Sequence, residues 1–156
     1  MDKRRVNVRA VVWRDGKILA VKHTSKGGDG VAAYWCLPGG GLDPHESLVD
    51  GVKREGMEET GVDATVGKPL FIQQFASERE HRDEELELLF LVEDTPAFDT
   101  IDLAATSHGL EEIAEIAFVD PTAVRILPAF LASIDIASYI GADKPVYLYS
   151  GFGETI

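Results

Sequence analysis

The sequence lacks several features that define other classes of protein. Its 156 residues include one cysteine, Cys36, so an internal disulfide is excluded. Lysine and arginine number 15 against 27 aspartates and glutamates, and the net charge of −12 argues against nonspecific binding to nucleic acid or anionic membranes. No run is apolar for long enough to span a bilayer, and Arg9 and Arg14 interrupt the N-terminal stretch before it reaches signal-peptide length. These absences predict a cytoplasmic protein.

Length and composition are those of an ordinary globular chain. A hydrophobic content of 45% and a charged content of 27% are typical of soluble proteins. A chain of this length is about one domain and can bury a proper core. We therefore expect residues 1–156 to form a single domain.

An unusual concentration of acid lies near the middle of the chain. Three glutamates lie at Glu55, Glu58 and Glu59, with Arg54 directly before the first. In a helix, separations of three and four residues place these carboxylates on one face, where they repel one another unless a positive partner is present. Carboxylate oxygens are the ligands that Mg²⁺ prefers, usually together with substrate phosphates. The alternative interpretation is a solvated acidic face.

The residues around these glutamates favour the metal interpretation. A glycine is followed after five residues by a glutamate, after seven more by Arg-Glu, and then by a Glu-Glu pair and a glycine. This spacing resembles the signature of the Nudix hydrolase family. All seven fixed positions of that signature match: Gly40, Glu46, Arg54, Glu55, Glu58, Glu59 and Gly61. One position departs from the signature, which has an apolar residue where this chain has Gly56. Together with Gly51, the expected helix then holds two glycines, each of which should lower helix stability by about 1 kcal/mol relative to alanine.

The resemblance implies a fold and a chemistry. The implied fold is of the α/β class, an α/β/α sandwich around a mixed β-sheet. The implied reaction is hydrolysis of a diphosphate bond in a nucleoside diphosphate linked to another moiety, with Mg²⁺ or Mn²⁺ as cofactor and a small nucleotide diphosphate as the binding partner. A homodimer is also considered.

The resemblance also suggests roles for individual residues. Glu58 and Glu59 are expected as metal ligands, with Glu55 as a third ligand or as the base, and a carbonyl of the turn at Gly40 joining the metal shell. Arg54 would hold Glu55 or another carboxylate of the helix in place. Two further glutamates remain open: Glu46 as a support of the loop–helix junction or a ligand of a further metal, and Glu112 as a catalytic or merely exposed residue. No substrate-binding residue is assigned from the sequence.

Three other interpretations of the same residues are weighed. A non-catalytic nucleotide-sensing domain on this scaffold would be marked by loss of the glutamates, and none is lost. An isomerase of prenyl diphosphates would need a catalytic cysteine in its own motif, and Cys36 lies in an apolar run without one. A structural protein would leave the signature unexplained.

The remaining chain reads as strands with one late helix. Alternation predicts a strand near residues 6–12 that returns at 18–21 through an Asp15-Gly16 turn, and further strands near 64–76, 86–92, 112–119 and 146–149. Asp120-Pro121 is a helix start, with a helical stripe closed by Gly141. We expect the charged run 77–84 to be a solvated hairpin tip and residues 26–30 a mobile loop. Glu85 and Glu87 share a strand face, which points either to water or to the metal site.

Overall fold

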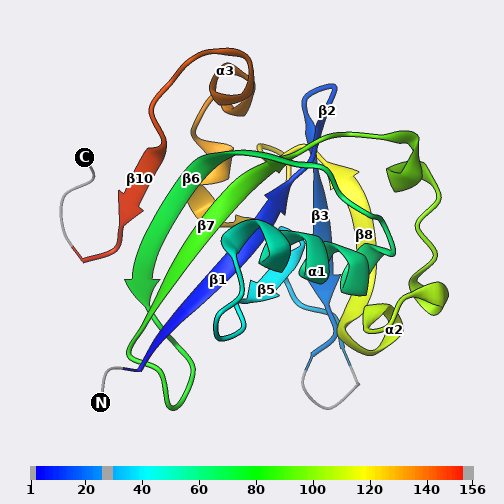
Figure 1. Ribbon diagram of the computed structural model, residues 1–156, viewed down its shortest axis with the longest axis horizontal. Helices are drawn as coiled ribbons and strands as arrows, with labels where there is room; N and C mark the ends of the chain where they lie inside the picture. Colours follow the sequence, from blue (N-terminus) through cyan, green and yellow to red (C-terminus); the bar gives the residue numbers. More distant parts are fainter. Residues whose placement is uncertain (1–2, 26–29, 153–156) are drawn as a thin grey trace.

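The computed structural model describes residues 3–25 and 30–152, which fold around two β-sheets (Figure 1). The larger sheet has the strand order β10-β6-β7-β1-β5. Its strands are β1 (Arg4–Val11), β5 (Gly39–Gly41), β6 (Val66–Ala76), β7 (Glu84–Val92) and β10 (Tyr147–Ser150). The sheet is mixed, as expected, because β1 and β10 run parallel to their neighbours β7 and β6 while the other pairs are antiparallel.

The smaller sheet continues from the end of β1. Its strands are β2 (Trp13–Arg14), β3 (Lys17–His23), β4 (Trp35–Cys36), β8 (Ile113–Val119) and β9 (Ile126–Leu127). Asp15 and Gly16, with φ of 48° and 79°, form the turn between β2 and β3. Two successive positive φ values are what a tight hairpin needs, so the predicted Asp-Gly hairpin is confirmed. Four residues of the predicted mobile loop, 26–29, lie outside the described residues.

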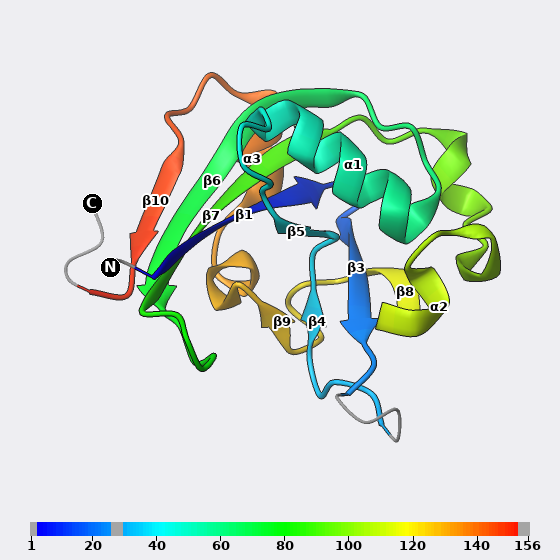
Figure 2. The same ribbon diagram turned by 60° about the horizontal axis from the view of Figure 1, so that its bottom comes forward.

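One long helix covers one side of the larger sheet (Figure 2). This is α1 (Leu48–Thr60). At its start the Ser47 hydroxyl accepts from the Asp50 N–H, and at its end Gly61 closes the helix with a left-handed φ of 73°. The other helical segments are shorter: η1 (Pro96–Asp99), η2 (Leu103–Ala105), α2 (Gly109–Glu112), η3 (Ala129–Ala132) and α3 (Ile136–Gly141). Within the described ranges, no helix combines the length and the apolar character that crossing a bilayer requires.

Apolar residues fill both faces of the larger sheet. On the α1 side, Val8 of β1 and Phe90 of β7 share a buried cluster with Val52 of the helix. On the opposite side, their strand neighbours Val11 and Leu89 join a second cluster that also holds Leu131 of η3 and Ile136 of α3. Alternate residues of one strand thus serve opposite layers. The arrangement is the α/β sandwich around a mixed sheet that the sequence predicts.

The predicted helix from Asp120-Pro121 to Gly141 is wrong. Residues 120–124 form turns, the chain then pairs as β9 with β4, and helical structure is limited to the short η3 and α3. Pro128 lies in the middle of this range, where it has no N–H to donate and disfavours helical conformation in the residue before it. The apolar residues of the predicted stripe still face the core, but from separate short segments.

Candidate active site

The three signature glutamates of α1 lie on one face of the helix, toward a large cavity. Glu55, Glu58 and Glu59 all line this cavity, whose volume is about 880 Å³. Glu59 is the deepest, with only 2% of its surface exposed, and Glu55 and Glu58 are partly buried. The helical spacing read from the sequence therefore produces the shared acidic face that it predicts.

The glycine turn before α1 packs directly against these carboxylates. The Gly39 N–H donates to Glu59 Oε2 at 3.1 Å. Gly40 is held in β5 opposite Val8, and a Cβ added to it would lie 2.6 Å from Glu55 Oε1. Any side chain at Gly40 would therefore displace the Glu55 carboxylate. The turn and the helix face form one unit, in which Gly40 lies beside the Glu55 carboxylate.

Arg54 holds the outer carboxylates in place. Its guanidinium donates to both oxygens of Glu46 at 2.7 and 2.9 Å, to Glu55 Oε1 at 2.9 Å and to the Gly41 carbonyl at 2.9 Å, and it lies 3.4 Å from Glu58 Oε2. Such charge-assisted, forked bonding fixes geometry as well as supplying energy. Arg54 thus contacts Glu46, Glu55 and Glu58 together, and Glu46 also accepts from the Asp43 N–H in the loop before the helix.

Burial differs among the acids and shifts their pKa values differently. Burial raises the pKa of Glu59 to about 8, against the opposing effects of the Arg9 charge and the Gly39 N–H. Burial also raises the pKa of Glu55, although the Arg54 guanidinium opposes the shift. Hydrogen bonds from Arg54 lower the pKa of Glu46. The deepest acid is thus the one that would gain most from a nearby cation.

A second group of residues completes the acidic end of the cavity. His108 lies with its Nδ1 3.3 Å from Glu58 Oε2, and its backbone N–H donates to the Glu58 carbonyl at 3.2 Å. Glu111 and Glu112, at the end of α2, also line the cavity. The structure therefore brings Glu112 to the same cavity as the α1 acids, although 53 to 57 residues of sequence separate them.

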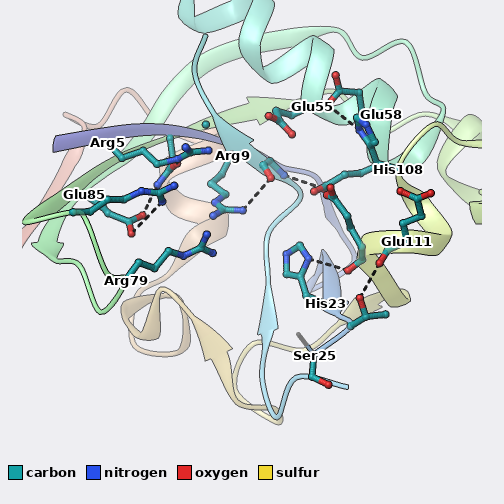
Figure 3. Close-up of a pocket in the computed structure, with 18 residues that line it drawn as sticks. Arg5, Arg9, His23, Ser25, Glu55, Glu58, Arg79, Glu85, His108 and Glu111 are labelled. Carbon is teal, nitrogen blue, oxygen red and sulfur yellow. Dashed lines mark hydrogen bonds and ion pairs between the residues drawn. The ribbon is translucent and has the colours of Figure 1, made fainter. Parts of the chain in front are cut away.

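The opposite end of the cavity is basic (Figure 3). Arg5 and Arg79 lie there with Glu85, while Glu55, Glu58, His108 and Glu111 lie across the cavity. Arg82 also lines the cavity. The charged run 77–84 forms the largely exposed tip between β6 and β7, as expected, and its two arginines also line the cavity. Glu85 faces this basic end, not the α1 carboxylates.

Arg9 and His23 lie between the two ends (Figure 3). Arg9 donates to the carbonyls of Leu37 and Gly39 at 3.1 and 3.2 Å, and it pairs with Glu87 Oε1 at 3.1 Å. Glu87 is 5% exposed, so it serves as the counter-ion of Arg9 and faces neither the solvent nor the cavity. Arg9 thereby stabilises the backbone of the glycine turn through two hydrogen bonds. Burial lowers the pKa of His23, whose Nδ1 lies 3.2 Å from the Glu112 carbonyl.

Sequence reasoning missed the residues that come from β1. Arg5, Asn7 and Arg9 are alternate residues of one strand, so they form a polar stripe on one face. That stripe lies beside Glu85 and Glu87 on the same face of the sheet, because β1 and β7 pair in parallel with Arg5 next to Glu85 and Asn7 next to Glu87. The alternation was present in the sequence as a signal, but the pairing that places the two strands side by side is not visible there.

The acidic end fits a hard divalent cation by its chemistry. Its donors are carboxylate oxygens and backbone carbonyls, and the absence of a Cβ at Gly40 lets the Glu55 carboxylate lie directly against the turn. Among residues 3–25 and 30–152, no three His, Cys, Asp or Glu side chains converge into a ready-made ion cage. Glu55 and Glu58 instead turn toward Arg54, and Glu59 toward the Gly39 N–H. Cation binding would therefore draw these carboxylates away from the bonds that hold them.

Known proteins resemble this chain in sequence and fold. Phosphatase NudJ of Escherichia coli K12 is 42% identical over 64 residues, which cover 41% of this chain and 39% of NudJ, so the chain spans about two-fifths of the length of this curated relative. The MutT protein of Methanosarcina mazei Go1 superposes with a TM-score of 0.65 at 22% identity, covering 92% of this chain and 98% of that protein. A UDP-X diphosphatase gives a TM-score of 0.70 at 19% identity, covering 95% and 68%.

A family model carries the assignment further than these pairwise matches. The NUDIX domain model matches residues 3–138, which include both ends of the cavity and the whole of α1. The family resemblance read from the seven signature positions is thereby confirmed. With a match that extends from the first described strand into α3, the chain belongs to the Nudix family.

Proposed function

We propose that the protein hydrolyses a diphosphate bond in a small nucleotide-derived molecule, with Mg²⁺ or Mn²⁺ held by the α1 acids. One observation carries the proposal: Glu55, Glu58 and Glu59 share a cavity with the Gly40 backbone, and Arg54 orders the outer carboxylates. An acidic cavity repels a diphosphate unless cations offset its charge. The acidic lining therefore favours a metal-dependent enzyme over a protein that binds the phosphates without a metal.

Each residue has a distinct part in the proposed reaction. Glu58 and Glu59 would hold the metal, with the Gly40 carbonyl beside them and Glu55 either as a third ligand or as the base that takes a proton from water. A bound divalent ion would neutralise the diphosphate and acidify the attacking water. Arg54 orients Glu55 and Glu58 from behind, and it lies outside the cavity lining. Glu112 is proposed as a further acid at the same end of the cavity.

The similar proteins support the reaction class. They include a phosphatase, a UDP-X diphosphatase and an ADP-ribose pyrophosphatase from Streptococcus suis 89-1591, which superposes with a TM-score of 0.56 at 19% identity. These names differ in the moiety attached to the phosphates. We infer that the acidic end carries the common chemistry and that the remaining wall selects the substrate.

The alternative of a nucleotide-sensing domain is weaker. A sensor has no need of ordered acids, and here every signature glutamate is present and bonded as a unit. The sensor would bind nucleotides without turning them over, so one assay separates the two functions.

The test is a panel of nucleotide sugars, ADP-ribose, dinucleoside polyphosphates and nucleoside triphosphates, each assayed with Mg²⁺, with Mn²⁺ and with EDTA. At least one substrate should be cleaved, only with metal, and Glu58→Gln should abolish the cleavage. Glu115→Gln is the matched control, because Glu115 is an exposed residue of β8 that does not line the cavity. Binding without turnover across the whole panel would favour the sensor instead.

A further inference from the structure

Three arginines from two distant parts of the chain meet at the basic end of the cavity. Arg5 comes from β1, and Arg79 and Arg82 come from the turn that joins β6 to β7. The parallel pairing of β1 with β7 places Arg5 opposite Glu85, just after that turn. Strand register therefore places Arg5 beside the base of the turn, and the turn brings Arg79 and Arg82 to the same cavity.

The positive charge of this cluster is left almost unpaired. Among the described residues, Glu85 is the only carboxylate within 4.0 Å of any of the three guanidiniums, and its distance to Arg82 is 3.9 Å. Arg4, Arg14 and Arg54 all have carboxylate partners, in a chain with 27 acidic residues. Acids are plentiful, so the shortage of them at the basic end is a local feature of the cavity.

The electrostatics of the cluster agree with this geometry. Burial lowers the pKa of Arg5, and the charges of Arg82 and Arg79 lower it further. Burial tends to raise the pKa of Glu85, but hydrogen bonds from Ser77 and Asn7, with the charges of Arg79 and Arg82, outweigh it and lower the pKa. Glu85 is therefore ionised at neutral pH, and it neutralises only part of the positive charge around it.

Arg5 is also held in place before any ligand arrives. Its Nε donates to Asn7 Oδ1 at 2.9 Å, and Asn7 in turn donates to Glu85 Oε2 at 2.7 Å from a position that is 3% exposed. The guanidinium lies across Gly41, where a Cβ would overlap it. The absence of a side chain at Gly41 therefore makes room for Arg5 to face the cavity. An ordered guanidinium loses less freedom when it binds an anion.

We propose that Arg5, Arg79 and Arg82 form a subsite for a phosphate group of the substrate other than the diphosphate being cleaved. Guanidinium forks match phosphate oxygens, and an anion would relieve the mutual repulsion of the three charges. The subsite faces the acidic end across one cavity, so a single molecule can reach both ends. This proposal rests on the proposed function, and it names the substrate class as compounds with at least one phosphate beyond the scissile pair.

The extra phosphate has two chemical sources, and paired substrates distinguish them. The first pair is a nucleoside triphosphate and the matching diphosphate, which differ in the terminal phosphate of the chain. The second pair is ADP-ribose 2′-phosphate and ADP-ribose, which differ in a phosphate monoester. The measured quantity is the ratio of kcat/KM within each pair, for the wild type, Arg79→Gln and Arg82→Gln.

Loss of one arginine should lower that ratio by about tenfold, the effect of removing a hydrogen bond to a charged group. Arg4→Gln is the matched control, because it removes the same charge from the neighbouring residue of β1, which pairs with Glu84 outside the cavity. A selective loss in the first pair identifies a terminal phosphate, and a loss in the second identifies a monoester. Equal effects on both members of both pairs would overturn the subsite.

A binding measurement keeps this test separate from the proposed function. Inorganic tripolyphosphate is titrated into each variant in EDTA by calorimetry, where no turnover is needed. Wild type and Arg4→Gln should bind it alike, and Arg79→Gln should bind about tenfold more weakly. A protein that cleaves nothing but shows this pattern would refute the proposed function and retain the subsite. Equal affinities in all variants would refute the subsite.

Discussion

Gly56 offers the sharpest test of how the helix carrying the acids is packed. The Nudix signature has an apolar residue at this position, and the glycine is buried in the middle of α1. A Cβ built on Gly56 meets no atom within 4 Å, and a small void lies beside it, lined by Val52, Thr60 and Phe98 among others. The space that the missing side chain would occupy is therefore still present.

The expected magnitude follows from the local geometry. Gly56→Ala removes the backbone freedom that glycine has in the unfolded chain and introduces a better helix former, which stabilises by about 1 kcal/mol. The new methyl group makes no close contact, so packing adds little to this and opposes none of it. For a chain of this size, the melting midpoint should rise by about 2–4 °C.

Gly51 provides a control in the same helix. A Cβ there would lie 2.6 Å from Leu42 Cδ1, 3.2 Å from Val8 Cγ2 and 3.3 Å from Glu46 Oε2. Overpacking of this kind costs about 1–3 kcal/mol, which offsets or exceeds the same gain in helix propensity. Gly51→Ala should therefore leave the midpoint unchanged or lower it.

The assay is thermal unfolding of the wild type and both variants in EDTA, followed by circular dichroism. A rise for Gly56→Ala with none for Gly51→Ala agrees with the geometry. A fall in the midpoint of Gly56→Ala would mean that the site is crowded, and an equal rise in both variants would mean that helix propensity alone decides. Either result would refute the reasoning.

Three further predictions concern the charged residues. Glu58→Gln should be nearly neutral for stability in EDTA, because Arg54 and His108 already face this carboxylate. With Mg²⁺ at a hundred times its dissociation constant, the wild type should gain about 2.7 kcal/mol of stability and the variant less. Paired melting curves in EDTA and in Mg²⁺ measure this difference. Turnover of Glu58→Gln should fall about a hundredfold or more, and a fully active variant would exclude Glu58 as a ligand. Burial raises the pKa of Glu59 from 4.5 to about 8, so between these pH values the folded protein keeps a proton that the unfolded chain releases. The stability of the metal-free protein should therefore fall as the pH rises from 4.5 to 8. Urea unfolding at several pH values should show this slope reduced in Glu59→Gln, and an unchanged slope would contradict it. Arg9→Met should lower the free energy of unfolding by about 3–5 kcal/mol, because it leaves Glu87 buried without its counter-ion. Adding Glu87→Gln should recover part of that loss in denaturant titrations. A double variant no more stable than Arg9→Met would contradict the stabilising role of the ion pair.

The sequence was most informative where structure is local. The face of α1 and the Asp15-Gly16 turn depend on residues a few positions apart, and both are found as predicted. Helical spacing is enough to bring Glu55 and Glu59 together, because no distant contact is needed to define a helix face. The acidic half of the candidate site was therefore predictable.

The basic half was not predictable, because it depends on contacts between distant segments. Arg5 and Arg79 are 74 positions apart and meet only through the parallel pairing of β1 with β7. The same limit explains the wrong C-terminal helix. The apolar stripe near Phe130 is compatible both with one helix and with several short segments. The pairing of β9 with β4, together with Pro128, excludes the single helix.

The turn between β6 and β7 bears on how such a protein can change over generations. The Ser77 N–H donates to the Asp83 carbonyl at 3.1 Å and closes the turn at its base, so the residues beyond that bond form a separate tip. The acids and the glycine turn are encoded in one continuous stretch, residues 39–59. Insertions, deletions or charge changes in the tip can accumulate without altering that stretch or the strand register beneath it. The part of the cavity wall that carries Arg79 and Arg82 can thus vary in sequence independently of residues 39–59. Exchanging this tip between homologous proteins should change the range of substrates while leaving α1 unchanged.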